Sequence, residues 1–199
     1  MVGQSSEEIP MCVGLVQTYR AFAYNNAWAN YRLLGACAEL TQDEFEAERT
    51  GFFPSLQATL NHIYGIDLFY VDALEGGWLG PKAWETTIPF PALAGLSEAQ
   101  ASIDRRFIGV CDALTPDLLS GEVRINRGSR VQVERRDRLL MHLFQHQIHH
   151  RGQAHAMLSS TRIKPPQLDE FFSIAEAPLR AAEFAGLGWT EETVWGPAP

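Results

Sequence analysis

Five of the six histidines in this chain lie between Leu139 and Met157, and their spacing bears directly on metal chemistry. The stretch is rich in Leu, Met, Gln and Ala and has no Gly or Pro before Gly152, which predicts a helix. On a helical wheel, His146 and His150 lie one turn apart on an apolar stripe that we expect to face the interior. Two imidazoles at this spacing have Cβ atoms about 5–6 Å apart, so both can bind one zinc-like ion.

The same spacing has a second interpretation, in which both rings are hydrogen-bonded core residues and no metal is bound. The wheel places His142 and His149 at the flank of the stripe and His155 nearly opposite it. Gln147 stands where the H-E-x-x-H motif of metalloproteases has its glutamate, and an amide cannot act as a general base. A zincin-type protease is therefore excluded, while the choice between a metal pair and a core pair stays open.

The sixth histidine, His62, lies far upstream on another predicted helix. This helix follows Pro54, which we expect in its first turn, and it ends at Gly76-Gly77. His62 points inward from the middle of the helix, and the small residues Ala58 and Gly65 on the same face leave room beside it. Alone it is typical of a core histidine, but together with the histidine pair it supplies the third nitrogen that a catalytic-type metal site requires.

The composition is that of one globular domain spanning residues 1–199, with 46% hydrophobic and 20% charged residues. The net charge of −8 argues against nucleic acid as a partner. Cys12, Cys37 and Cys111 are scattered and form no C-x-x-C motif, so we expect reduced thiols that pack between helices. No apolar run approaches the length of about 18 residues that suggests a membrane span, and the first residues lack the features of a signal peptide. We therefore expect a cytoplasmic protein without membrane contact.

Two asparagines, Asn26 and Asn30, lie in the inward stripe of a long helix predicted over residues 11–40. A buried amide needs hydrogen-bond partners, so these side chains either bond to neighbouring backbone or buried water, or point into a polar pocket. The other expected elements follow from capping, turn and alternation signals: a capping box at Thr41–Glu44 before a short helix, a surface loop over 78–96, a capping box at Ser97–Gln100 opening a helix to about Leu114, a hairpin with strands 122–125 and 130–133, the histidine helix over 135–160, and tail helices over 169–176 and after Pro178.

The histidine helix is apolar on two sides. Its face away from His146 carries Phe144 and Ile148, so a second structure must cover that face. Either the C-terminal tail or a second subunit can do so, and the sequence leaves both open.

Three segments together resemble the DinB/YfiT-like family, over roughly residues 15–170. They are Tyr24-Asn-Asn-Ala-Trp-Ala-Asn30 on the first helix, Ser55-Leu-Gln-Ala-Thr-Leu-Asn-His62 on the second, and His142-Leu-Phe-Gln-His-Gln-Ile-His-His-Arg-Gly-Gln153 on the fourth. The run His149-His-Arg-Gly-Gln153 is the most specific of these matches.

The resemblance implies an all-α fold, a four-helix bundle with unusual connections, here with a short hairpin before the fourth helix and small helices at the C-terminus. It also implies a divalent metal ion held by His62, His146 and His150, with the other three histidines not ligands. Members of the family usually carry zinc or nickel and often form homodimers, which would account for Phe144 and Ile148.

Three neutral imidazoles leave a coordination position open for water or substrate. A metal there can lower the pKa of bound water to about 7 or hold a thiolate. Relatives implied by the resemblance include thiol-dependent S-transferases and hydrolases. Our main hypothesis is therefore such a metal-dependent enzyme, acting on a small molecule and possibly using a low-molecular-weight thiol. The alternative is a non-catalytic, stress-induced protein whose metal stabilises the bundle or is sensed.

The roles of the remaining candidate residues are less defined. Gln153, one turn below His150, either contacts a metal ligand or substrate or packs between helices. Arg151 projects away from the metal face, and we expect it in a structural or interface role. No carboxylate shares the wheel faces of the three histidines, so the sequence identifies no general base and no catalytic residue.

Overall fold

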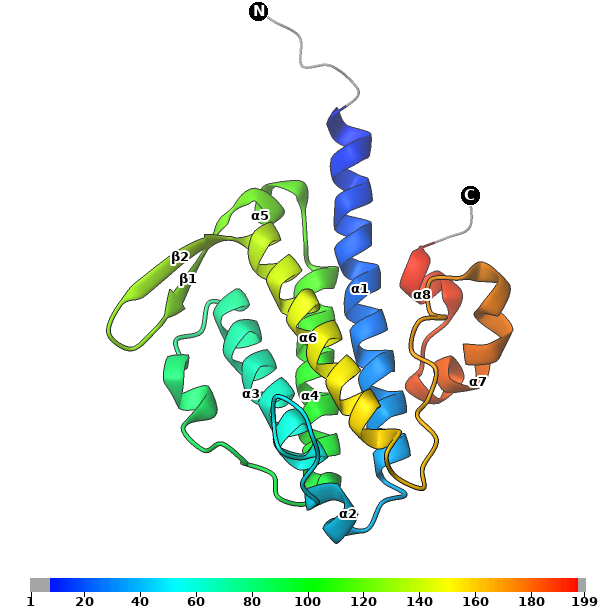
Figure 1. Ribbon diagram of the computed structural model, residues 1–199. Coiled ribbons are helices and arrows are strands. Elements are labelled where there is room, and N and C mark those ends of the chain that lie inside the picture. The colour runs from blue at the N-terminus through cyan, green and yellow to red at the C-terminus, as the bar shows by residue number, and fades with distance from the viewer. Residues whose placement is uncertain (1–7, 197–199) are drawn as a thin grey trace, which may run out of the picture.

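The architecture is a four-helix bundle with a small hairpin and a helical tail, and the computed structural model describes residues 8–196 (Figure 1). The bundle helices are α1 (Glu8–Cys37), α3 (Leu56–Leu74), α4 (Leu93–Asp112) and α6 (Arg136–Leu158). Helix α1 packs against α4 and α6, and α3 packs against the same two helices, so α1 and α3 lie diagonally across the bundle. The predicted four-helix bundle is confirmed.

Short elements connect the bundle helices and form the tail. The predicted hairpin is present as an antiparallel pair in which Val123 is paired with Glu134, and Gly128 has a φ of 78° at its turn. Among residues 8–196, no helix is both long and apolar enough to cross a bilayer. The short elements are α2 (Gln42–Glu46), η1 (Gly80–Trp84), α5 (Pro116–Ser120), β1 (Glu122–Asn126), β2 (Val131–Arg135), η2 (Ile174–Glu176), α7 (Ala177–Leu187) and α8 (Glu191–Trp195).

Local capping decides where several helices begin. The predicted capping box before α2 is present, with the Thr41 side chain and the Glu44 side chain each accepting from the other residue's backbone N–H. Ser55 caps α3 by accepting from the Ala58 backbone N–H. The expectation for Pro54 is wrong, because it precedes this cap and lies outside the first turn.

Two predictions about helix boundaries are wrong because tertiary packing outweighs the local signal. Helix α4 begins at Leu93, not at a capping box formed by Ser97, since this earlier turn allows Leu96 to be buried. The tail is helical only over Ile174–Glu176 of the predicted 169–176 segment. Residues 169–173 form a bend and a turn in which the Ser173 backbone N–H donates to the Glu170 backbone oxygen. Phe171 in this turn packs against Trp28 of α1, with ring centroids 5.5 Å apart.

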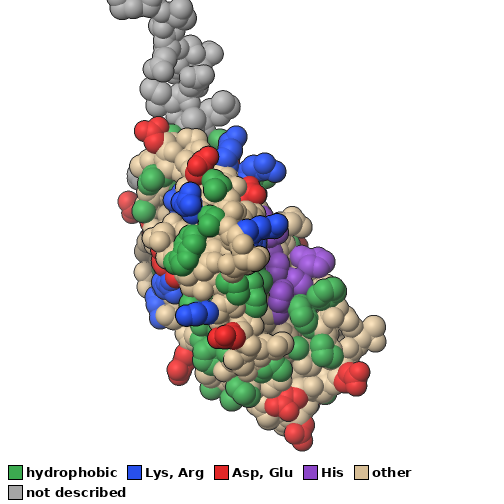
Figure 2. Space-filling view, turned by 90° about the vertical axis from the view of Figure 1, so that its left-hand side faces the viewer, with side chains coloured by type: hydrophobic (Ala, Val, Ile, Leu, Met, Phe, Trp, Pro, Cys, Tyr) green, Lys and Arg blue, Asp and Glu red, His purple; other side chains and the backbone are tan. Residues whose placement is uncertain are grey.

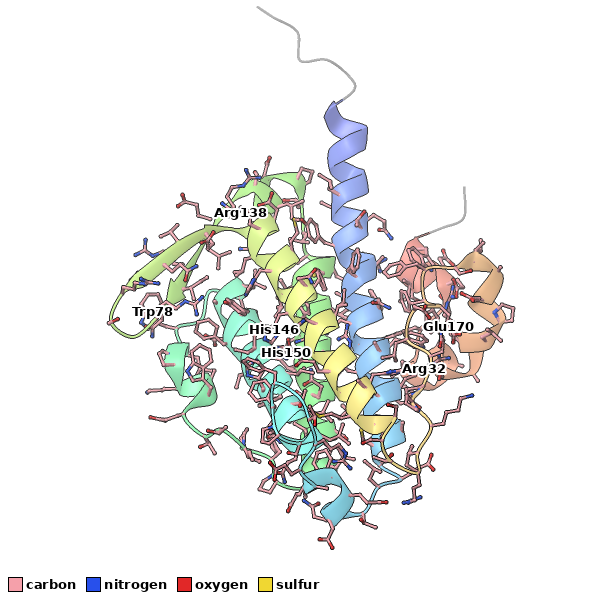
Figure 3. All side chains as sticks on the ribbon, in the orientation of Figure 1. Arg32, Trp78, Arg138, His146, His150 and Glu170 are labelled. Carbon is pink, nitrogen blue, oxygen red and sulfur yellow. The ribbon has the colours of Figure 1, made fainter. Side chains whose placement is uncertain are left out.

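The tail covers α1 through charges as well as apolar contacts (Figure 3). Arg32 of α1 forms ion pairs with Glu170 and with Glu183, the second at 2.7 Å. Trp28 Nε1 donates to Glu183 Oε2 at 2.7 Å. The tail is therefore fixed to the bundle by a partly buried charge cluster.

The second apolar side of α6 is covered from within the chain. Phe144 is buried, and its ring lies 5.4 Å from that of Phe22 on α1 and 5.0 Å from that of Phe107 on α4. Ile148 remains 49% exposed and borders a groove with Phe172 of the tail. Phe144 thus needs no second subunit, whereas Ile148 is only partly covered.

The described cysteines have packing roles. Cys37 and Cys111 are free and fully buried, and burial raises the pKa of the Cys37 thiol to about 12. The side chain of Cys12 lies outside the residues whose side chains the structure describes.

A buried polar network crosses the middle of the bundle, with Arg151 of α6 at its centre. Its guanidinium Nη1 donates to Asn26 Oδ1 and, at 3.1 Å, to Asn30 Oδ1 of α1. The amide nitrogens of both asparagines donate in turn to Asp104 of α4, at 3.2 and 2.9 Å. The two asparagines therefore bond to side chains, and not to neighbouring backbone or in an open pocket. They link the buried Arg151 cation to the buried Asp104 carboxyl group.

The same network reaches α3 through Asp67. Gln147, one turn before Arg151, donates to Asp67, and Gln100 of α4 donates to Asp67 at 2.8 Å and to Asp104 at 3.1 Å. Burial raises the pKa of Asp67 well above its usual value, with the charge of Asp104 adding to the effect, and burial raises the pKa of Asp104 to about 6. All four bundle helices are thus joined by hydrogen bonds directly behind the face that carries the histidines.

Replacing the central cation should destabilise the bundle strongly. We expect Arg151→Met to lower the free energy of unfolding by about 3 kcal/mol or more, because it leaves buried carboxyl and amide groups without their partner. Arg138→Met, at an exposed position on the same helix, should change it by less than about 0.5 kcal/mol. Urea unfolding followed by circular dichroism measures both. Equal stability of the two variants would contradict a central role for Arg151.

Candidate metal centre

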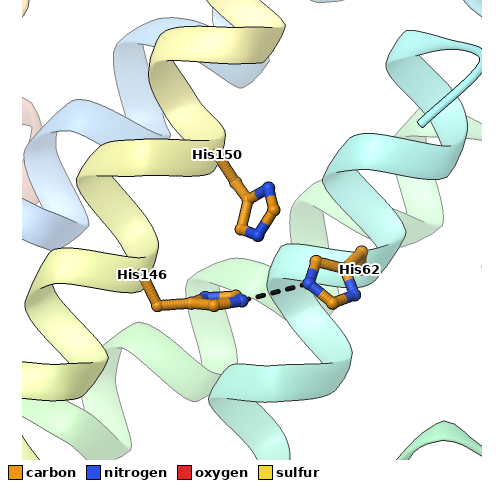
Figure 4. A group of neighbouring side chains, drawn as sticks. All are labelled: His62, His146 and His150. Atoms are coloured by element: carbon orange, nitrogen blue, oxygen red, sulfur yellow. Dashed lines mark hydrogen bonds between the residues drawn. The ribbon is translucent and has the colours of Figure 1, made fainter. Parts of the chain in front are cut away.

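The three histidines singled out in the sequence meet on one side of the bundle, between α3 and α6 (Figure 4). The ring centroid of His62 lies 5.0 Å from that of His146 and 4.6 Å from that of His150, and the two rings of α6 are 4.4 Å apart. One ring nitrogen from each lies within 4.8 Å of the other two. The shortest approach joins Nε2 of His62 and Nε2 of His146 at 3.0 Å.

The surroundings keep these imidazoles neutral at physiological pH. Burial lowers the pKa of His62 to about 4 and that of His146 to about 3, and the neighbouring histidines add to both effects. Burial also lowers the pKa of His150, against the opposing effect of the hydrogen bond that its ring donates to Gln153. Neutral rings offer lone pairs, which is the protonation state that metal binding needs.

The donor set fits a divalent metal ion. Three nitrogens that each lie about 2.0–2.1 Å from one ion must be roughly 3 Å from one another, and the Nε2 atoms of His62 and His146 already are. Imidazole nitrogen is a preferred ligand of zinc and nickel. His146 Nδ1 is buried and has no hydrogen-bond partner among the described residues, so its ring orientation is set by packing.

Gln153 fixes the tautomer of His150. Its Oε1 lies 2.8 Å from His150 Nδ1 and can only accept, so that nitrogen carries the proton and Nε2 keeps its lone pair. The Gln153 amide nitrogen donates to His149 Nε2 at 3.1 Å. Of the two roles considered for Gln153, the structure therefore places it in contact with a candidate ligand.

The other histidines do not join the group of three. His142 packs edge-on against Tyr70, with ring centroids 5.4 Å apart, and His155 Nε2 lies 2.9 Å from the backbone oxygen of Pro166. Arg151, expected to be structural or at an interface, is buried in the polar network. No Asp, Glu or Cys joins the cluster among the described residues, so the structure adds no general base.

Two aromatic residues at the site were not predicted. The ring of Phe53 lies 4.4 Å from that of His62 and 5.6 Å from that of His150, and Phe52, which is 75% exposed, lies 6.2 Å from His150. Both belong to the irregular segment before α3, where no helical or strand periodicity could have indicated their direction. They give the histidines an apolar border.

Of the three candidate ligands, His62 and His146 are half-buried and His150 is buried. Figure 2 shows histidine side chains at the molecular surface next to hydrophobic ones. A separate apolar pocket lies between α1 and α4, on the diagonally opposite edge of the bundle, and it contains no histidine. The centre between α3 and α6 is therefore the part of the described chain best suited to metal chemistry.

Comparison with known proteins identifies the family and supports the fold. A family model described as the DinB family matches residues 11–182. The chain belongs to the DinB family. A crystal structure of a DinB-like protein from Bacillus cereus ATCC 10987 is similar to this chain, with a TM-score of 0.56 and 15% sequence identity over 73% of this chain and 94% of that one. At this identity the likeness concerns the fold, and no curated protein matches the chain significantly.

The lowered histidine pKa values predict how the metal-free protein responds to acid. The unfolded chain takes up protons at these histidines below about pH 6.5, whereas the folded chain does not until pH falls to about 4 at His62 and about 3 at His146. These two histidines should therefore lower the free energy of unfolding as pH decreases from 6.5 to 4, while the buried Asp67 and Asp104, with their raised pKa values, act in the opposite direction. Urea unfolding at both ends of this range should show that the change in the free energy of unfolding is less unfavourable for His146→Leu than for the wild type. Identical slopes for the two proteins would contradict neutral, buried rings.

The contact between Gln153 and His150 predicts an effect on metal affinity. Gln153→Met removes the acceptor that orients His150, and we expect zinc affinity to fall about 10–100-fold. Gln145→Met, at an exposed position two turns earlier on α6, should leave affinity unchanged. Competition titration with a zinc-sensitive dye measures both constants. Equal affinities would assign Gln153 to helix packing alone.

Proposed function

We propose that this DinB-family protein is a metal-dependent enzyme, an S-transferase or hydrolase, with His62, His146 and His150 as the metal ligands. The observation that supports this most is the convergence of three neutral imidazoles, two of them only half-buried. Bound zinc or nickel would supply Lewis acidity toward a thiol sulfur, a water or a carbonyl oxygen. In the transferase case a low-molecular-weight thiol is the second substrate.

The chain's own residues perform the positioning. Helix α6 presents two ligands from one face, α3 presents the third, and Gln153 holds the His150 ring in the tautomer with a free Nε2. Phe53 borders the open side and limits access of water to it. Among the described residues, no Asp, Glu or Cys that could act as a general base joins the cluster. This favours reactions in which the metal ion itself activates a thiol or a water.

A catalytic role is favoured over a structural metal because the bundle has other sources of stability. Apolar side chains form two buried clusters, one around Trp28 and Phe107 and the other around Leu33 and Leu56. The polar network around Arg151 joins the four helices without them. The bundle thus has ample stabilising contacts in the absence of an ion, and metal removal is not expected to unfold it.

We further propose, as the family resemblance implied, that the protein forms a homodimer. The support is limited to partly exposed apolar side chains beside α6, such as Ile148 and Phe172. Sedimentation velocity on the purified protein tests this independently of the metal.

Metal analysis and an activity screen test the proposed function. Protein purified without a His-tag should contain about one zinc or nickel per chain, and the loaded protein should transfer a thiol to electrophiles or hydrolyse esters. His146→Ala should lose most of the metal and the activity while keeping the helical circular dichroism. His142→Ala, outside the group of three, should retain both.

Two outcomes would contradict the proposal. Far less than one equivalent of metal after incubation with zinc and nickel would favour a metal-free bundle. Loss of the helical signal on chelation would favour a structural metal.

A further inference from the structure

A pocket of about 360 Å³ lies beside His62, between α3 and the segment that contains η1. On the α3 side, Ala58, His62 and Gly65 share one face of the helix. A Cβ added to Gly65 would lie 3.5 Å from the backbone oxygen of Ala83, an ordinary contact, so a side chain larger than that of alanine would meet the opposite wall. The lining residues are Phe53, Ala58, Asn61, His62, Gly65, Ile66, Trp84, Thr86 and Thr87.

The polar groups in this lining are few, and one of them is already used. Asn61 donates to the backbone oxygens of Gln57 and Phe90, both at 3.0 Å, and accepts from the Phe90 backbone N–H at 3.0 Å. Thr86 and Thr87 contribute the only hydroxyl groups of the lining. Lys, Arg, Asp and Glu are absent from it. A charged ligand group would therefore lose its hydration here without gaining an ionic partner.

Phe53 connects this pocket to the metal centre. It lines the pocket, its ring lies 4.4 Å from that of His62, and the same ring lies 5.6 Å from that of His150. A molecule in the pocket therefore lies against a candidate ligand on one side. Trp84, whose ring lies 4.3 Å from that of Phe69 on α3, also lines the pocket.

We infer that this pocket binds a neutral, apolar group, an arene or a branched alkyl chain, of the compound that reacts at the histidine centre. That this compound reacts at the histidine centre rests on the proposed function, whereas the preference for a neutral apolar ligand follows from the lining alone. Aromatic and aliphatic walls bind such groups by burying their surface. An acidic group on the same part of the molecule would be rejected.

Two matched probes test the preference, 4-methylbenzyl alcohol as the neutral arene and 4-methylbenzoate as the anion. In metal-free wild-type protein, where a carboxylate cannot coordinate an ion, we expect the alcohol to bind at least about tenfold more tightly. Ligand titrations followed by NMR give both constants. Nuclear Overhauser effects from the alcohol to the Trp84 indole locate the site without any variant.

A variant pair adds a steric test. Gly65→Leu should fill the pocket and weaken binding of the alcohol at least about tenfold, while Gly186→Leu, at an exposed position of α7 with nothing near its added Cβ, should leave it unchanged. Equal or tighter binding of the carboxylate, or contacts of the alcohol with residues outside the pocket, would overturn the inference.

The same titrations, repeated with zinc-loaded protein, separate this inference from the proposed function. If the protein binds the alcohol but takes up no zinc when incubated with it, the pocket is supported and the metal-dependent function is contradicted. Zinc binding without alcohol binding in either form would contradict the pocket and leave the function standing.

Discussion

The structure depends on one buried cation, the Arg151 guanidinium, and on the amides that connect it to two carboxyl groups. Each of these amides accepts from Arg151 and donates onward, Asn26 and Asn30 to Asp104 and Gln147 to Asp67. Since a buried charge is costly without such partners, α6 has one favourable rotation about its axis. His146 and His150 directly precede Gln147 and Arg151 in the sequence, so this rotation points both histidines toward α3.

The residues that stabilise the bundle are not the residues proposed to bind the metal. The apolar clusters and the polar network join the helices, and the tail is held to α1 by Arg32 and its two acidic partners. The three histidines lie between α3 and α6, two half-buried and His150 buried, and none takes part in the polar network. Their rings are therefore free to serve as metal ligands. The rest of the fold supplies the stability that offsets the unfavourable free energy of keeping three neutral polar side chains together.

Much of the bundle could be predicted from local signals, because long amphipathic helices and a hairpin leave clear periodic patterns. The inward direction of His62, His146 and His150 could be predicted from helical wheels. Their convergence on one point could not, because helix pairing is a tertiary property, and it was expected from the family resemblance. Ser97 shows the opposite case, in which a good capping sequence is overridden because burial of Leu96 starts α4 one turn earlier. The partners of Asn26 and Arg151 lie on different helices, so the wheel could predict that they needed partners without identifying them.

The central claim is that three imidazole nitrogens from α3 and α6 bind one cation and leave a coordination position free. X-ray absorption spectroscopy at the zinc edge of the loaded protein measures this most directly. We predict a first shell of three imidazole nitrogens at about 2.0–2.1 Å with one further light atom from water or buffer. A shell with one or two imidazoles, or with four protein ligands and no exchangeable position, would contradict the account.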